Sequence, residues 1–146
     1  MASSRTTAQT LLDLFAGLQA RAGGDLVARL DGAQLSMTQY KALGVLAGSR
    51  AGLSVKELAD RLSLSGPATS RATDHLVRLR YVERTEDDRD RRSKRLEATT
   101  DGRTLAAELD AVRLAGWRAV LDELTPAERT ALHDAAQPML TRLAAR

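Results

Sequence analysis

The chain has 146 residues, of which 43% are hydrophobic and 28% charged, and its formal net charge is +3. This length and composition are typical of one globular domain and exclude a disordered chain. There is no cysteine and there are only two histidines, which excludes disulfides, thiol chemistry and Cys-type zinc sites and argues against any metal site.

No apolar run is long enough to cross a membrane, and residues 1–10 lack the apolar core of a signal peptide. We therefore expect a cytoplasmic protein with no bound cofactor. Residues 71–95 contain nine Lys or Arg and six Asp or Glu, a surplus of three that equals the net charge of the whole chain. Such a local excess is typical of a nucleic-acid-binding surface, although a solvated surface can show it too.

The first predicted helix covers residues 5–30, where apolar residues recur at spacings of three and four. Gly23 and Gly24 are expected to kink or split this helix. A second helix is predicted to begin after Ser36, whose side chain can form a capping box with Gln39.

Two short helices joined by a tight turn follow. Ser54 and Glu57 form a second predicted capping box, at the start of a helix that ends at Leu62. Ser65 can cap the next helix, which extends to about Leu79. The arrangement is typical of a helix-turn-helix.

After Leu79 the apolar period changes. Residues 81–85 and 95–99 flank a polar, charged loop, which predicts a β-hairpin. Thr99 or Thr100 then caps a long helix, and the segment 125–128 supplies the cap of the last one. The predicted order is α-α-α-α-β-β-α-α, a single mainly α domain over residues 1–146 with a winged helix-turn-helix at 54–100.

The helix that begins after Ser65 has two different faces. Ala72, Leu76 and Leu79 lie on one side, whereas the other side carries small residues and then arginines. This second face suits the major groove of DNA, where Arg can pair with guanine. It could also be an ordinary solvated face, but an arginine-tipped hairpin beside it favours DNA. The candidate reading residues are Ser65, Pro67, Ser70, Arg71, His75 and Arg78, and His75 could either contact DNA or be solvated.

Three motifs in this order resemble those of the MarR family of bacterial transcriptional regulators, and the resemblance covers nearly the full chain. Residues 53–65 are similar to the helix-turn-helix of the family, and Ser70-Arg71 followed by Asp74 to its recognition helix. Residues 87–92, followed by Thr99 and Gly102-Arg103, are similar to its wing. The resemblance implies a sequence-specific regulator, most simply a repressor, that binds a pseudo-palindromic operator in double-stranded DNA.

The resemblance also implies a homodimer, with dimerisation helices at residues 5–35 and 100–146. Apolar residues of these terminal helices could instead form the core of a monomer. In the family, Ser70, Arg71 and the residue at position 75 would contact bases or phosphates. Arg89 would enter the minor groove, with Arg91 and Arg92 as further contacts, and Asp87 is interpreted as a salt-bridge partner that holds these arginines.

Many relatives release DNA when a small anionic aromatic effector binds. Residues that could line such a pocket here are Phe15, Tyr40, Leu43 and Trp117, although ordinary core packing is the favoured explanation for them. Ser63 and Arg80 stand where the family often has glycine, so slightly different backbone geometry is expected at both. His75 stands where many members have arginine, which leaves the base preference open.

A winged helix can serve protein contacts or sequence-blind DNA compaction, which is the main alternative. An enzyme is not expected, because the sequence has no phosphate-binding Gly-rich loop, nucleophile motif or metal-ligand cluster.

Overall fold

The computed structural model describes residues 3–86 and 94–144, and this part of the chain is mainly helical, as predicted. Its elements are α1 (Ser4–Ala22), α2 (Gly24–Gly32), α3 (Met37–Ala47), α4 (Val55–Leu62), α5 (Gly66–Arg78), β1 (Val82–Glu86), β2 (Lys94–Ala98), α6 (Thr100–Leu121) and α7 (Pro126–Ala144). The first predicted helix is split at Gly23, so five helices precede the strands.

The helices begin where the sequence places capping residues. The Ser54 hydroxyl accepts a hydrogen bond from the Glu57 backbone N–H at 3.2 Å, and the Glu57 carboxylate accepts one from the Ser54 N–H at 2.7 Å. Ser36 and Gln39 form the same box at the start of α3. Each box satisfies backbone donors that the first helical turn leaves unpaired, which fixes the first residue of the helix.

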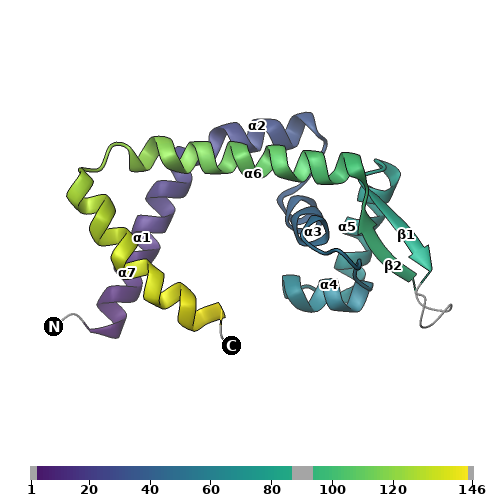
Figure 1. The fold of residues 1–146 in the computed structure, drawn as a ribbon, viewed down its shortest axis with the longest axis horizontal. Helices are drawn as coiled ribbons and strands as arrows, with labels where there is room; N and C mark the ends of the chain where they lie inside the picture. The colour runs from purple at the N-terminus through teal and green to yellow at the C-terminus, as the bar shows by residue number, and fades with distance from the viewer. Residues whose placement is uncertain (1–2, 87–93, 145–146) are drawn as a thin grey trace. The chain divides into compact units, whose positions relative to one another are not determined.

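The chain divides into two compact units, residues 26–112 and residues 1–25 together with 113–146. In the first unit, α3, α4 and α5 lie together beside the hairpin of β1 and β2 (Figure 1). The side chains that fill its core are almost completely buried leucines from helices and strand alike: Leu43, Leu46, Leu58, Leu76, Leu96 and Leu109. This core packs against the buried face of α5, to which Leu76 belongs.

The predicted hairpin is confirmed, with bounds that differ by one residue from those expected. Strands β1 and β2 are antiparallel, and Val82 pairs with Ala98 at one end and Glu86 with Lys94 at the other. Leu53 adds an isolated bridge to Leu96, so the segment before α4 is attached to β2.

Two backbone positions concern the residues that stand where the family often has glycine. Ser63 and Arg80 have φ of 53° and 60°, in the left-handed region that favours glycine. At both positions the chain therefore has a conformation that glycine adopts readily. It keeps this conformation with side chains that adopt it less readily.

In the unit formed by residues 1–25 and 113–146, large apolar side chains are exposed. They include Leu11, Leu12, Leu14 and Phe15 of α1, Leu114 of α6, and Met139, Leu140 and Leu143 of α7. None of the described residues of α7 is buried. A helix of this length normally depends on tertiary packing for its stability, and the single chain supplies little of it.

Across the described residues, no helix combines the length and the apolar character needed to span a membrane.

Candidate DNA-binding site

Helix α5 is held by one buried face. Thr69, Ala72, Thr73 and Leu76 are buried, as the helical period predicts for this side. The hydroxyl groups of Thr69 and Thr73 donate to the backbone carbonyls of Ser65 and Thr69, each at 3.0 Å, so their polar atoms are satisfied inside the protein. The opposite face of α5 is left free for a partner.

The opposite face carries the predicted reading residues. Pro67, Arg71 and Arg78 are exposed, and Ser70 is half-buried. Arg71 makes no hydrogen bond or ion pair with any residue that the structure describes. Its guanidinium is therefore available to form a bidentate hydrogen bond with a base or a phosphate. The Ser65 hydroxyl accepts from the Ala68 N–H at 3.4 Å, which makes Ser65 the N-cap of α5.

His75 lies at the edge of this face and is half-buried. Its Nε2 is 2.9 Å from the carbonyl oxygen of Gln34, and its Nδ1 is 3.2 Å from Nη2 of Arg78. A neutral imidazole satisfies both contacts if Nε2–H donates to Gln34 and Nδ1 accepts from Arg78. His75 thus connects α5 to the loop before α3 and holds Arg78, and direct contact with DNA would require it to leave these partners.

Asp74 is the acidic residue on the outer side of α5. Its carboxylate forms an ion pair with Arg84 of β1, and both side chains are partly exposed. This pair offsets the negative charge that would otherwise oppose a phosphate backbone, and it joins the recognition helix to the hairpin. The sequence does not reveal it, because no periodic pattern relates a helix residue to a strand residue ten positions later.

Arg95 of β2 is a second residue that sequence reasoning missed. It donates to the carbonyl oxygens of Ala51 and Gly52 at 2.8 and 3.0 Å, and it lies 3.7 Å from the Glu57 carboxylate. Arg95 therefore secures the hairpin to the start of the helix-turn-helix. Gly52 has φ of 64°, and a Cβ there would lie 2.6 Å from the Glu97 side chain, so this turn requires glycine.

The pKa of Glu57 is lowered below its usual 4.5, chiefly by the hydrogen bond from the Ser54 N–H, then by the Ser54 hydroxyl and by the nearby charge of Arg95. A carboxylate with a lowered pKa stabilises the fold above its unfolded value, and this contribution is lost as the pH falls through the folded value. Glu57→Gln keeps an oxygen that can accept the bond but does not titrate. We expect the advantage of the parent protein over Glu57→Gln, measured by urea unfolding, to shrink as the pH falls below 4.5.

The capping box of α3 offers the reciprocal control, because it has Gln39 at the position of Glu57. Gln39→Glu should gain the pH dependence that Glu57→Gln loses. Parallel curves of unfolding free energy against pH for the parent and Glu57→Gln would show that the charge of Glu57 does not contribute.

The predicted wing contacts Arg89, Arg91 and Arg92, and the predicted salt-bridge residue Asp87, lie outside the described residues. The described stem of the hairpin ends at Glu86 and Lys94, which face each other in register.

The four residues predicted to line an effector pocket lie in different surroundings. Phe15 and Trp117 are in contact, with ring centroids 5.9 Å apart, in the unit of residues 1–25 and 113–146. Tyr40 and Leu43 belong to the core of residues 26–112, where Leu43 has no exposed surface and the Tyr40 hydroxyl donates to Asp110 at 2.6 Å. Within residues 3–86 and 94–144, no group of three or more acidic or histidine side chains could hold a metal ion.

Comparison with known proteins agrees with this geometry. Residues 33–93 match the sequence model of the MarR family, whereas a comparison with curated proteins gives no match. Among solved structures, the transcriptional regulator PA3341 is 25% identical, with a TM-score of 0.67 over 96% of this chain and 99% of that one. YusO from Bacillus subtilis is 24% identical, with a TM-score of 0.73 over 96% and 99%.

MepR, a transcription regulator of the Staphylococcus aureus multidrug efflux pump MepA, is 21% identical, with a TM-score of 0.74 over 93% of this chain and 97% of MepR. MepR has also been solved in complex with DNA and bound to ethidium bromide. These structures share the winged-helix fold over almost their full length, and the sequence match contains α3, α4, α5 and β1. Residues 33–93 of the chain are thus similar to the MarR family of transcription regulators, and the fold is that of its solved members.

Proposed function

We propose that the chain is a sequence-specific DNA-binding regulator, acting in the cytoplasm as a repressor. The observation that carries this proposal is the outer face of α5, where Arg71 is unpaired among the described residues and Arg78 is held by His75. Small residues precede these arginines, so the backbone of the helix can approach the floor of a major groove closely. The structure of MepR with DNA supports the same use of a similar fold.

We further propose that the wing acts beside this helix. Arg89 would enter the minor groove, Arg91 and Arg92 would contact the groove or phosphates, and Asp87 would hold these arginines by salt bridges. Arginine in a narrow minor groove is a common means of reading DNA shape.

A homodimer is the second part of the proposal, with residues 5–35 and 100–146 as the dimerisation region. The support is the row of exposed apolar side chains on α1 and α7, which monomeric proteins rarely leave in contact with water. Two copies would place their recognition helices in successive major grooves, about 34 Å apart, on a pseudo-palindromic operator.

The third part is release of DNA by a small molecule. MepR has been solved bound to ethidium bromide, which supports a small-molecule effector for a protein of this fold. Phe15, Tyr40, Leu43 and Trp117 stay the predicted lining of an aromatic effector site, and titration with anionic aromatic compounds during DNA binding would test it.

The decisive experiment is selection of bound fragments from genomic DNA at about 150 mM salt, where sequence-independent binding is weak. A regulator should enrich one symmetrical sequence and prefer it over random DNA by about 4–10 kcal/mol. A compaction protein would bind random DNA nearly as well, and a protein-interaction module would retain no fragments. Either of these results would contradict the proposal.

Arg71→Ala tests the reading face directly. We expect the substitution to weaken binding to the selected operator by about 1–3 kcal/mol, because a bidentate contact with one base is lost. The measurement is fluorescence anisotropy with operator and random duplexes at one salt concentration. The loss should be confined to the operator.

Arg50→Ala is the matched control, since Arg50 is also exposed but lies between α3 and α4, outside the recognition helix and the proposed dimerisation region. It removes the same charge and should leave operator binding unchanged. An equal loss of affinity for operator and random DNA in Arg71→Ala would reassign Arg71 to a phosphate contact.

A further inference from the structure

A second binding site is suggested by a cavity in the unit of residues 26–112. The cavity has a volume of about 330 Å³ and lies between α2, the residue that precedes β1, and the first turns of α6. This volume falls at the low end of the range found for small-molecule sites, roughly 300–1,000 Å³. It would suit a molecule with a single ring.

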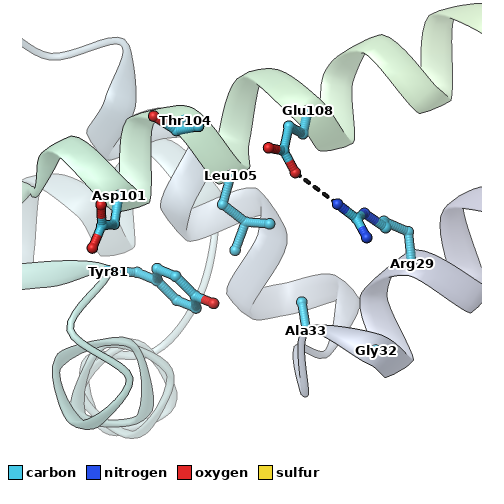
Figure 2. Close-up of a pocket in the computed structure, with 8 residues that line it drawn as sticks. All are labelled: Arg29, Gly32, Ala33, Tyr81, Asp101, Thr104, Leu105 and Glu108. Atoms are coloured by element: carbon cyan, nitrogen blue, oxygen red, sulfur yellow. Dashed lines mark hydrogen bonds and ion pairs between the residues drawn. The ribbon is translucent and has the colours of Figure 1, made fainter.

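The floor of the cavity is formed by apolar and aromatic groups, within a lining whose surface is mostly polar. Tyr81, Leu105 and Ala33 are half-buried and pack against the core of the unit. Figure 2 shows Leu105 pointing down from α6 into the space between Tyr81 and Ala33, with the Tyr81 ring extending toward α2. The floor therefore offers an aromatic ring and an aliphatic side chain to the body of a ligand.

The rim of the cavity has an excess of negative charge. Arg29 of α2 forms an ion pair with Glu108 of α6 at 2.8 Å, so these two charges offset each other (Figure 2). Asp101 forms no hydrogen bond or ion pair with any side chain in the described part of the chain. Asp101, Thr104, Leu105 and Glu108 share one face of α6, since they are three, four and seven residues apart. Among the described residues that line the cavity, the one unpaired charge is thus a carboxylate, beside an aromatic ring.

We propose that this cavity binds a small organic cation. Its ammonium or amidinium group would pair with Asp101, and its apolar body would lie on Tyr81 and Leu105. A cation near an aromatic ring gains a further electrostatic attraction. An anion would face the unpaired carboxylate, because Arg29, the arginine among the described residues that line the cavity, already has a partner. The proposed ligand differs in charge from the anionic effectors expected from the family.

The backbone of Tyr81 connects the cavity to the recognition helix. The Tyr81 N–H donates to the carbonyl of Leu76 in α5 at 3.0 Å, and its own carbonyl accepts from the Thr99 N–H, just before α6, at 3.0 Å. The Thr99 hydroxyl also donates to the Arg80 carbonyl at 2.8 Å. A ligand that displaces the Tyr81 ring would strain this junction at the end of α5. Occupancy should therefore alter DNA binding, a consequence that rests on the proposed function.

The test is an NMR titration of the full chain with phenethylammonium, in the absence of DNA. We expect saturable shifts of Tyr81, Leu105 and their neighbours, with a dissociation constant on the order of 1 mM for so small a molecule. Phenylacetate, an anion with the same ring, should produce no such shifts. Asp101→Asn should weaken binding about threefold or more, as loss of a partly exposed ion pair does. Asp31→Asn is the control, because Asp31 is exposed on α2 and does not line the cavity.

Three results would overturn the site: no saturable shifts at the cavity, equal binding of phenylacetate, or equal affinity of Asp101→Asn and the parent protein. Coupling is measured separately, as the change in operator affinity when phenethylammonium saturates the protein. An unchanged operator affinity would overturn the coupling while leaving the site in place. Failure to find any operator would contradict the proposed function alone, since the titration contains no DNA.

Discussion

Replacing Leu140 by glutamate is expected to convert the proposed dimer into a monomer. Leu140 is 59% exposed in the single chain and belongs to α7, of which no described residue is buried. If α7 packs against a second copy, each protomer buries this leucine, and burial of one leucine contributes about 1.5–3 kcal/mol. Because a twofold interface carries the substitution twice, we expect a loss of about 3–6 kcal/mol in dimerisation free energy. Sedimentation velocity over a range of concentrations measures this loss.

Met37→Glu provides the control. Met37 is 43% exposed and also apolar, but it begins α3 and lies outside the terminal helices. This variant should sediment as the parent protein does. A Leu140→Glu protein that keeps the parent's sedimentation coefficient and helical circular dichroism would exclude α7 from the interface. A monomeric Leu140→Glu protein should also lose operator affinity, because its two recognition helices are no longer joined.

The elements that the sequence predicts well are those fixed by residues three or four positions apart. The boxes of Ser36 with Gln39 and Ser54 with Glu57 are confirmed, because each is formed within one turn by side chains of known preference. The inner face of α5 follows from the helical period for the same reason. Once the inner face is known, the arginines are assigned to the outer face because they lie on the remaining side of the helix.

The contacts that orient the site depend on residues far apart in the chain. His75 meets the carbonyl of Gln34 across 41 positions, and Arg95 meets that of Ala51 across 44. Both carbonyls belong to loops, and the backbone conformation that turns them toward these side chains has no pattern in the sequence. Gln34 itself has φ of 56°. The sequence could therefore predict a basic face on α5, but not which of its side chains is held by a hydrogen bond to a distant loop.

Ser63 and Arg80 show a second feature that could not be predicted from the sequence, namely their backbone conformation. Their left-handed φ is set by the tight turns after α4 and after α5, and neither residue type favours it. The surrounding structure imposes the conformation: Leu64 N–H donates to the Ala59 carbonyl and Tyr81 N–H to the Leu76 carbonyl, both at 3.0 Å. These bonds close the ends of the two helices in the manner of a glycine-terminated helix. Residue propensity is overridden there by a geometry that the fold requires.

Gly102→Ala is expected to lower the free energy of unfolding by about 3 kcal/mol, the upper end of what overpacking costs. A Cβ at Gly102 would lie 2.0 Å from the Tyr81 carbonyl oxygen and 2.9 Å from its carbonyl carbon, which no flexible side chain can relieve. The same oxygen accepts the Thr99 N–H, so a shift of Tyr81 would break a hydrogen bond of the junction between α5 and α6. Alanine gains at most about 1 kcal/mol over glycine in a helix, which does not offset this clash.

Gly44→Ala decides whether the clash or the helix preference governs the result. Gly44 lies inside α3, in the same unit, and an added Cβ would meet nothing within 4 Å. Its replacement should therefore raise the free energy of unfolding by up to about 1 kcal/mol, the gain in helix propensity alone. Urea unfolding of the two variants beside the parent protein should give shifts of opposite sign. A Gly102→Ala protein as stable as the parent would mean that α6 does not approach Tyr81 so closely, and the connection from Tyr81 to the recognition helix would lose its support.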